Sequence, residues 1–171
     1  MDIVTYPEEV LRQEAEEITE ITEEIRELAD KMTEVMFREE GVGLAAPQVG
    51  VGKKLIVVNP EEDFHILLNP KIVERSSEEE SMDEGCLSVP GPEAPVSRAQ
   101  KVVVEGTDLD GNDVRLTREG LAARVFQHEV DHVNGTLYID HLSEVERSIV
   151  LREYRKAGEE GKEGGEENSG L

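Results

Sequence analysis

Hydrophobic residues recur at helical spacing in one long segment of the N-terminal half of the chain. They lie three or four residues apart along a single face, while charged residues fill the other faces. The positions are Ile21, Ile25, Leu28, Met32 and Met36. The pattern predicts an amphipathic helix that ends at Gly41, because glycine commonly follows the last turn of a helix.

A second helical stripe lies in the C-terminal half and includes polar residues. It consists of Leu121, Val125, His128, Glu129 and His132. We expect this helix to begin at Thr117 and to be capped by Gly135. Weaker patterns predict a brief helix at residues 10–12 and a C-terminal helix over residues 143–156.

Short apolar runs between these helices predict strands. They occupy residues 55–58, 66–68, 72–73, 101–105 and 114–116. Asn59-Pro60 and Asn69-Pro70 close two of them, residues 76–80 read as a polar loop, and Asp108 to Gly111 as a hairpin turn. Residues 41–50 contain three Gly and one Pro and almost no charge, so they interrupt the regular pattern.

Length and composition indicate one domain without a membrane-spanning segment. The chain has 171 residues, and no apolar run reaches the roughly 18 residues that a spanning helix needs. Its start lacks the features of a signal peptide, so we expect a cytoplasmic protein. We expect a catalytic domain at residues 1–156 and a disordered acidic tail rich in Gly and Glu at residues 157–171.

The formal charge of −22 limits the classes of partner. The tail contributes −4 and the remaining residues −18, so the acidity belongs mainly to the folded part. Such a surface repels free nucleic acid and anionic membranes, and we expect neither as a partner. A solvated surface that keeps the protein soluble explains this charge, and adaptation to high salt is the alternative.

Residues 128–132 read H-E-V-D-H and carry the H-E-x-x-H pattern. Residues four apart on a helix lie on the same face, so two imidazoles there can bind one metal ion. Glu129 can then reach water bound to that ion. Because both histidines share the apolar stripe with Leu121 and Val125, they would be buried, and buried polar groups without partners are costly. The pattern therefore predicts a metal site.

Catalytic sites of the zinc type commonly use three protein ligands and leave one position open. Candidates for the third ligand are Cys86 and His65 upstream, and Asp140 and His141 downstream. We interpret His65 and His141 as surface residues, since one follows a charged stretch and the other lies near a helix start. Cys86 is favoured, because Gly85 allows close backbone approach and a thiolate complements two imidazoles. It is also the only cysteine, so no intramolecular disulfide is possible.

Two other classes of protein share parts of this pattern. Metallopeptidases with the H-E-x-x-H motif place their third ligand downstream, whereas Cys86 lies 42 residues upstream of His128. A structural zinc module needs four protein ligands, and only three convincing ones are visible. The pattern therefore favours a metal-dependent hydrolase.

Three segments together resemble the motifs of the peptide deformylase family. The family motifs G-x-G-L-A-A-x-Q, E-G-C-L-S and Q-H-E-x-D-H stand at residues 41–48, 84–88 and 127–132, intact and in the family's order. The similarity also includes residues 6–7 and 10–12 and Gly135, and it covers most of residues 1–150.

This resemblance implies a fold and an activity. The fold is α+β, with antiparallel sheets packed around a central helix that carries the H-E-x-x-H motif, an N-terminal helix and a C-terminal helix. The activity is removal of the formyl group from the N-terminal formyl-methionine of newly synthesised polypeptides, with release of formate.

The resemblance also implies roles for individual residues. It assigns the metal to Cys86, His128 and His132. It assigns general acid/base catalysis to Glu129, and oxyanion stabilisation to Gln48 and the backbone N–H of Leu87. Candidates for contact with the substrate methionine are Val42, Gly43, Gly85 and Val125.

The identity of the metal and of further partners is less constrained. Two imidazoles and a thiolate suit zinc, nickel, cobalt and ferrous iron, and the resemblance favours Fe(2+). Residues 146–156 form a local basic cluster in an acidic chain. Since some deformylases dock on the ribosome through a C-terminal helix, we expect that helix to be a candidate ribosome contact. Glu93 stands where some relatives have a basic residue near the peptide path.

Overall fold

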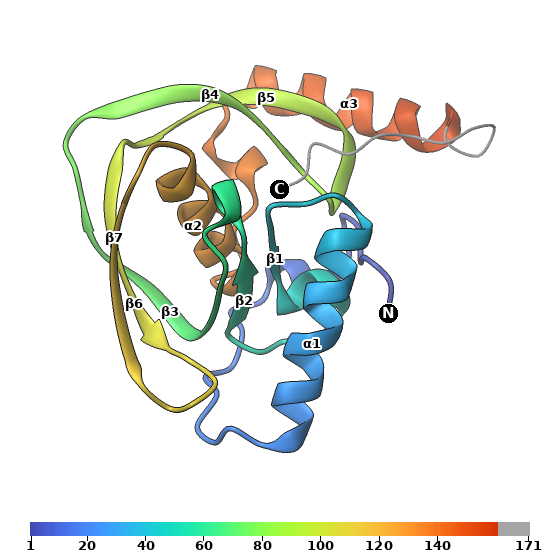
Figure 1. The fold of residues 1–171 in the computed structure, drawn as a ribbon. Helices are drawn as coiled ribbons and strands as arrows, with labels where there is room; N and C mark the ends of the chain where they lie inside the picture. Colours follow the sequence, from blue (N-terminus) through green and yellow to red (C-terminus); the bar gives the residue numbers. More distant parts are fainter. Residues whose placement is uncertain (161–171) are drawn as a thin grey trace.

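The computed structural model describes residues 1–160 as two antiparallel sheets and three α-helices (Figure 1). The helices are α1 (Glu23–Arg38), α2 (Gly120–Val133) and α3 (Glu144–Glu160). The strands are β1 (Gly43–Ala45), β2 (Leu55–Val58), β3 (His65–Arg75), β4 (Glu79–Cys86), β5 (Val89–Ala99), β6 (Lys101–Thr107) and β7 (Asp113–Glu119). Short 3₁₀ turns are η1 (Glu9–Arg12), η2 (Ala46–Val49), η3 (Pro60–Glu62) and η4 (Tyr138–His141).

The strands form one larger and one smaller sheet. The larger sheet has the order β1-β2-β3-β6-β7, and β4 pairs with β5 in a separate ribbon. All neighbouring strands in both sheets are antiparallel. Helix α2 lies between the two sheets, α1 lies beside β1 and β2, and α3 lies along β5 (Figure 1). This arrangement confirms the predicted α+β class.

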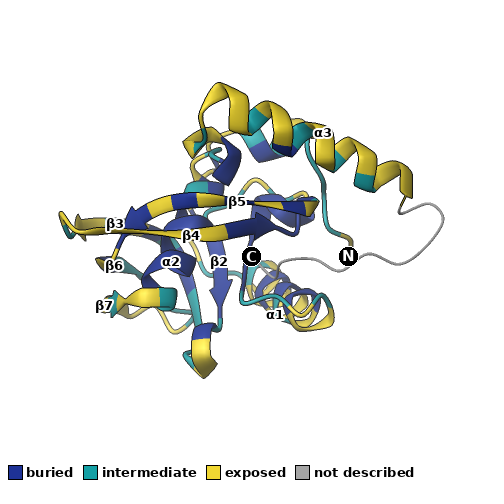
Figure 2. Cartoon of the chain, turned by 90° about the horizontal axis from the view of Figure 1, so that it is seen from above, coloured by how far each residue is buried: buried dark blue, intermediate teal, exposed yellow. Residues whose placement is uncertain are grey.

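Helix α2 is buried along most of its length, as Figure 2 shows. Its apolar residues pack against the inner face of the larger sheet. This cluster includes Ala123, Val125, Phe126, Val130 and Val133 from the helix and Ile56, Val58, Val102 and Val104 from the sheet. Because the helix is enclosed, its polar side chains must find partners inside the protein or bind a ligand.

Helix α1 confirms the predicted amphipathic helix, but its end differs in detail. Thr22 caps its start by accepting a hydrogen bond from the Ile25 N–H at 3.3 Å. At the other end, Glu40 and not Gly41 has the left-handed conformation, with φ of 56°. The Gly41 N–H donates to the Met36 carbonyl at 2.8 Å, which closes the last turn.

The segment at Asn69-Pro70 does not separate two strands, as the sequence pattern predicted. Residues 65–75 form the single strand β3, which has an irregular register at this point and a φ of 51° at Asn69. The Asn69 side chain makes two 2.8 Å hydrogen bonds with the backbone of Ile18. Those tertiary contacts hold the distorted residue in the strand.

The prediction that α2 begins at Thr117 was wrong. Thr117 pairs with Val103 as part of β7, and the helix begins only at Gly120, whose φ is 63°. The β4–β5 ribbon was not predicted either, and Glu79 and Glu80 of the expected polar loop belong to β4. The first five residues of β4 are all exposed and β5 contains three prolines, so neither strand shows an apolar run.

Helix α3 confirms the predicted C-terminal helix and extends four residues beyond its expected end at Lys156. Val150 on its inner face is buried, and the Tyr154 hydroxyl donates to the Tyr6 carbonyl at 2.7 Å. The remaining part of the predicted acidic tail, residues 161–171, lies outside the described residues. Within residues 1–160, no helix is long and apolar enough to cross a membrane.

Candidate metal centre and active site

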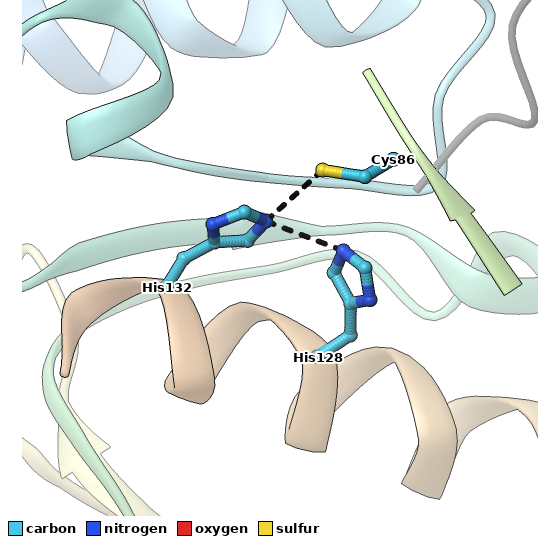
Figure 3. A group of neighbouring side chains, drawn as sticks. All are labelled: Cys86, His128 and His132. Carbon is cyan, nitrogen blue, oxygen red and sulfur yellow. Dashed lines mark hydrogen bonds between the residues drawn. The ribbon is translucent and has the colours of Figure 1, made fainter. Parts of the chain in front are cut away.

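Three side chains with metal-binding atoms converge between α2 and the end of β4 (Figure 3). His128 and His132 lie one turn apart on α2, and their Nε2 atoms are 3.2 Å apart. The Cys86 Sγ lies 3.3 Å from His132 Nε2, and all the potential ligand atoms lie within 4.8 Å of one another. All three side chains are buried. The structure therefore brings together the three residues that the sequence singled out.

Cys86 takes its position from an irregularity in the β4–β5 ribbon. The register shifts between Glu84 and Cys86, and Gly85 between them is buried. The backbone N–H of Ser88 points at the Cys86 sulfur at 3.4 Å. This N–H stabilises negative charge on the sulfur, which a thiolate ligand requires.

Glu84 holds His128 from the side opposite the other two metal-binding residues. Its Oε1 is 2.8 Å from His128 Nδ1, which leaves His128 Nε2 toward the metal centre. Metal-binding histidines typically use their second nitrogen in this way. Glu84 is fully buried and also binds the guanidinium groups of Arg98 and Arg124. Burial alone would raise the pKa of Glu84, but the hydrogen bonds from Arg98 and His128 outweigh burial and hold it well below its usual range.

The supporting roles of Glu84, Arg98 and Arg124 were not predicted from the sequence. Arg124 offered one signal, because it lies four residues before His128 and therefore shares the inward face of the helix. A charged residue on such a face needs a buried partner of opposite charge. The sequence did not reveal which carboxylate that partner would be.

The two histidines have different electrostatic environments. Burial lowers the pKa of His128, but hydrogen bonds with Cys86 and Glu84 and the charge of Glu129 outweigh burial and raise it to about 10. Burial and the neighbouring charge of His128 lower the pKa of His132. A metal ion that binds both imidazoles must displace the additional proton of His128, because metal-bound histidines are neutral.

Glu129 is buried with neither carboxylate oxygen hydrogen-bonded to any described residue. Burial raises its pKa to about 7, a value suited to proton transfer at neutral pH. Gly43 of β1 lies directly against it: a Cβ atom at that position would be 2.4 Å from Glu129 Oε2. The absence of a side chain at Gly43 therefore gives the carboxylate its space.

Gln48 lies on the other side of the cysteine, in the turn η2. Its Oε1 accepts the Ala45 N–H at 3.0 Å, which fixes the orientation of the amide. Its Nε2 donates to the Cys86 sulfur at 3.5 Å and to the Ser88 hydroxyl at 3.3 Å. Leu87, whose N–H was the second expected oxyanion donor, follows the cysteine directly and is buried.

The expected substrate contacts occupy different environments. Val42 is half-buried and packs at the edge of the cluster around α2, next to Gly43. Gly85 is buried in the ribbon, and Val125 is fully buried in the core. The contact of these residues with a methionine side chain stays a prediction.

The other two histidines lie apart from the metal centre. His65 Nε2 is 2.8 Å from Asp63, and His141 Nε2 is 2.8 Å from Asp131. Asp140, the other downstream candidate, binds Arg12 at 2.6 Å and the Leu137 N–H at 2.9 Å. Among the described residues, the group that could hold a metal is therefore Cys86, His128 and His132.

Comparison with known proteins gives consistent matches over most of the chain. The family model described as polypeptide deformylase matches residues 1–148. A peptide deformylase of Halothermothrix orenii is 48% identical over 143 residues, which cover 82% of this chain and 92% of that protein. One from Acidobacterium capsulatum is 44% identical over 160 residues, with 90% and 93% covered.

Solved structures of such proteins have the same fold. A peptide deformylase from Legionella pneumophila superposes with a TM-score of 0.88 at 39% identity, covering 92% of this chain and 95% of that chain. The peptide deformylase of Ehrlichia chaffeensis in complex with actinonin superposes with a TM-score of 0.87 at 39% identity, covering 91% and 96%.

Proposed function

Because this chain belongs to the peptide deformylase family, whose members remove the formyl group from the N-terminus of new polypeptides, we propose that Cys86, His128 and His132 hold the metal of that reaction. The main support for this proposal is that one buried sulfur and two imidazole nitrogens converge at this point. The enzyme is a metallohydrolase that acts on nascent formyl-methionyl chains and releases formate.

The donor set suits a divalent transition metal. Two imidazoles and a thiolate accept Fe(2+), zinc, nickel or cobalt, and we propose Fe(2+) from the resemblance to the family. Two features support the fit: Glu84 orients His128, and the carboxylate of Glu129 beside the site has no other partner among residues 1–160. When bound, the ion supplies a water nucleophile at neutral pH and polarises the formyl carbonyl.

Glu129 is the general acid/base of the proposed mechanism. It accepts a proton from the attacking water and delivers that proton to the amine nitrogen that leaves. Its pKa of about 7 allows both steps near neutral pH. The carboxylate needs no rearrangement of existing hydrogen bonds, because none of the described residues engages it.

Gln48 and the Leu87 N–H are the proposed donors to the oxygen that becomes negative during the reaction. Gln48 is held at its Oε1, while both present contacts of its Nε2 are long, at 3.3 and 3.5 Å. Donation to a substrate oxygen therefore replaces weak contacts. We further propose that Val42, Gly43, Gly85 and Val125 shape the site around the methionine, with Val42 as the most accessible of the four.

The structure removes the basis for the two alternative classes. A metallopeptidase of the H-E-x-x-H type needs a downstream ligand, but Asp140 and His141 are engaged by Arg12 and Asp131. A closed structural zinc site needs four protein ligands, and the group found within residues 1–160 has three.

Release of formate from formyl-Met-Ala-Ser by purified, metal-loaded protein tests the proposed site. We expect turnover by the wild type and none by Cys86→Ala. Actinonin, which is bound in the Ehrlichia chaffeensis structure, should inhibit the wild type. Full turnover and stoichiometric metal in Cys86→Ala would refute the ligand assignment. Cleavage of an internal peptide bond without release of formate would refute the activity.

We also propose that α3 contacts the ribosome, where the substrate emerges. Its outer face is exposed (Figure 2) and carries Val145, Ile149, Arg152 and Lys156 at helical spacing. Arg155 adds a further exposed charge. Arg guanidinium binds phosphate through paired hydrogen bonds, and the contact should weaken steeply with salt. Action on nascent chains also supports a cytoplasmic location.

Co-sedimentation with ribosomes at low salt tests this contact. Replacing Arg152, Arg155 and Lys156 by Glu leaves the buried face of α3 unchanged. We expect the variant to sediment less than the wild type while keeping its activity on a free formyl-peptide. Equal sedimentation of both proteins, or none of either, would exclude the contact.

A further inference from the structure

Asp131 lies inside the H-E-x-x-H motif, yet its carboxylate contacts Arg98 and His141 and not the metal-binding group. Its Oδ2 accepts one hydrogen bond from Arg98 Nη1 at 2.7 Å and is 2.8 Å from His141 Nε2. The carboxylate is therefore engaged on the side of β5 and η4, although its neighbours His128 and His132 converge with Cys86.

Arg98 connects the two structural elements that supply the metal ligands. Its Nε and Nη2 bind the two oxygens of Glu84 at 2.8 and 2.9 Å, and its Nη1 binds Asp131. Glu84 stands on β4 two residues before Cys86, and Asp131 stands on α2 next to His132. One buried guanidinium therefore ties the strand with the cysteine to the helix with both histidines.

Asp131 supplies the second carboxylate to the two buried arginines of this cluster. Arg98 and Arg124 bring two positive charges, and Glu84 and Asp131 bring two negative ones. Both arginine side chains are 4% exposed and Glu84 is fully buried, so solvent screens the cluster weakly. Without Asp131, the two guanidinium groups would share the single carboxylate of Glu84 beside a site for a metal cation. Loss of the carboxylate would therefore weaken metal binding through both geometry and charge.

We propose that Asp131, supported by His141, is a positioning residue for the metal centre. Through Arg98 it docks the β4–β5 ribbon on α2 and fixes the distance of Cys86 from the two histidines. His141 reaches the cluster from a solvent-accessible cavity of about 360 Å³, which Arg98, Gln127 and Asp131 also line. This inference rests on the proposed metal site.

The chain contains a matched control for Asp131. Asp63 also binds one arginine and one histidine: Arg118 Nε lies at 2.6 Å and His65 Nε2 at 2.8 Å. The exposure of the two aspartate side chains is similar, at 33% for Asp63 and 21% for Asp131. However, Arg118 lies on β7 and His65 on β3, so this cluster does not connect β4 to α2.

Binding of Co²⁺ to the metal-free protein tests the proposal. Affinity is measured by competition with a chelator, and the thiolate-to-cobalt charge-transfer band reports the bond to Cys86. We expect Asp131→Asn to weaken Co²⁺ binding by about tenfold, the low end for partners of metal ligands, because Asp131 acts on His128 through Arg98 and Glu84. Asp131→Ala should weaken it further. Asp63→Asn should leave the affinity and the band unchanged, although both substitutions lower the melting temperature.

Two results would overturn the proposal. The first is a Co²⁺ affinity in Asp131→Asn equal to that of Asp63→Asn. The second is a wild-type protein without the charge-transfer band, which would also remove the proposed metal site. Cys86→Ser separates the two questions, because loss of the band in that variant assigns the ion to the proposed ligands whatever the Asp131 variants show.

Milder substitutions keep the test decisive if the Asp131 variants do not fold. His141→Gln removes one of the two partners of Asp131, and His65→Gln is its matched control. We expect His141→Gln to weaken Co²⁺ binding by roughly threefold, less than Asp131→Asn, because the Asp131–Arg98 hydrogen bond remains. Equal affinities of His141→Gln and His65→Gln would overturn the role of this cluster.

Discussion

Replacement of Gly43 by alanine tests the geometry around the proposed general base. The added Cβ would lie 2.4 Å from Glu129 Oε2 and 2.9 Å from its Cδ and Cγ. Ordinary contacts between such atoms are about 3.4 Å or longer, so one of the groups must move by about 1 Å. β1 pairs with β2 and packs into the core, and we therefore expect the Glu129 side chain to shift.

We expect Gly43→Ala to lower kcat while the melting temperature stays close to that of the wild type. A displacement of about 1 Å of a catalytic group can reduce the rate about 10²-fold, which corresponds to roughly 2.7 kcal/mol in the activation free energy. The amount of bound metal should be unaffected, because the three atoms nearest to the added methyl group all belong to Glu129 and none to a metal-binding residue. Metal content, melting temperature and kcat on formyl-Met-Ala-Ser measure the three quantities separately.

Two controls make this prediction specific. Gly52→Ala should be neutral, since a Cβ at Gly52 would meet no atom within 4 Å. Gly43→Ala combined with Glu129→Gln should be no slower than Glu129→Gln alone, because both changes disable the same group. A Gly43→Ala enzyme with wild-type kcat would refute the reasoning. Additive losses in the double variant would show that Gly43 acts through something other than Glu129.

Three further outcomes follow from the site and the fold. Glu129→Gln should keep its metal while kcat falls by about 10²–10⁴, since glutamine cannot accept a proton; loss of metal in that variant would make Glu129 a ligand. Cys86→Ser and His132→Ala should each lose metal and activity together, as metal analysis and formate release would show. The hydrogen bond from Arg118 lowers the pKa of Asp63, so this pair stabilises the fold above the unfolded pKa and the benefit disappears as pH falls through the folded pKa. Urea unfolding should therefore show Asp63→Asn less stable than wild type by up to about 1 kcal/mol near neutral pH, with the difference vanishing in acid; a difference that grows in acid would contradict this sign.

The central helix shows how much of the site the sequence encodes locally. Spacing of four residues places His128 and His132 on one face of any helix, so their convergence was predictable before the fold was known. The preceding segment was less predictable. Residues 117–119 have no pattern that distinguishes the end of a strand from the start of a helix, and pairing of Thr117 with Val103 across the sheet decides the matter.

The position of Cys86 illustrates a different limit. Its residue type and the neighbouring motif indicated a ligand, but the 3.3 Å approach to His132 depends on how the β4–β5 ribbon packs on α2. That packing involves Arg98 and its two partners. Glu84 is 14 residues away from Arg98 along the chain, and Asp131 is 33 residues away. No local pattern specifies which buried charges will pair across such distances.

The sequence alone determined the helical faces, the metal-binding residue types, the acidic charge and the family motifs, because these depend on spacing and chemistry along the chain. Tertiary structure decided the bulge at Asn69, the start of α2, the space that Gly43 leaves for Glu129, and the Asp131–Arg98–Glu84 connection. The physical reason is common to all four. Each depends on contacts between segments that are distant in sequence, whose energies exist only once the sheets have enclosed the central helix.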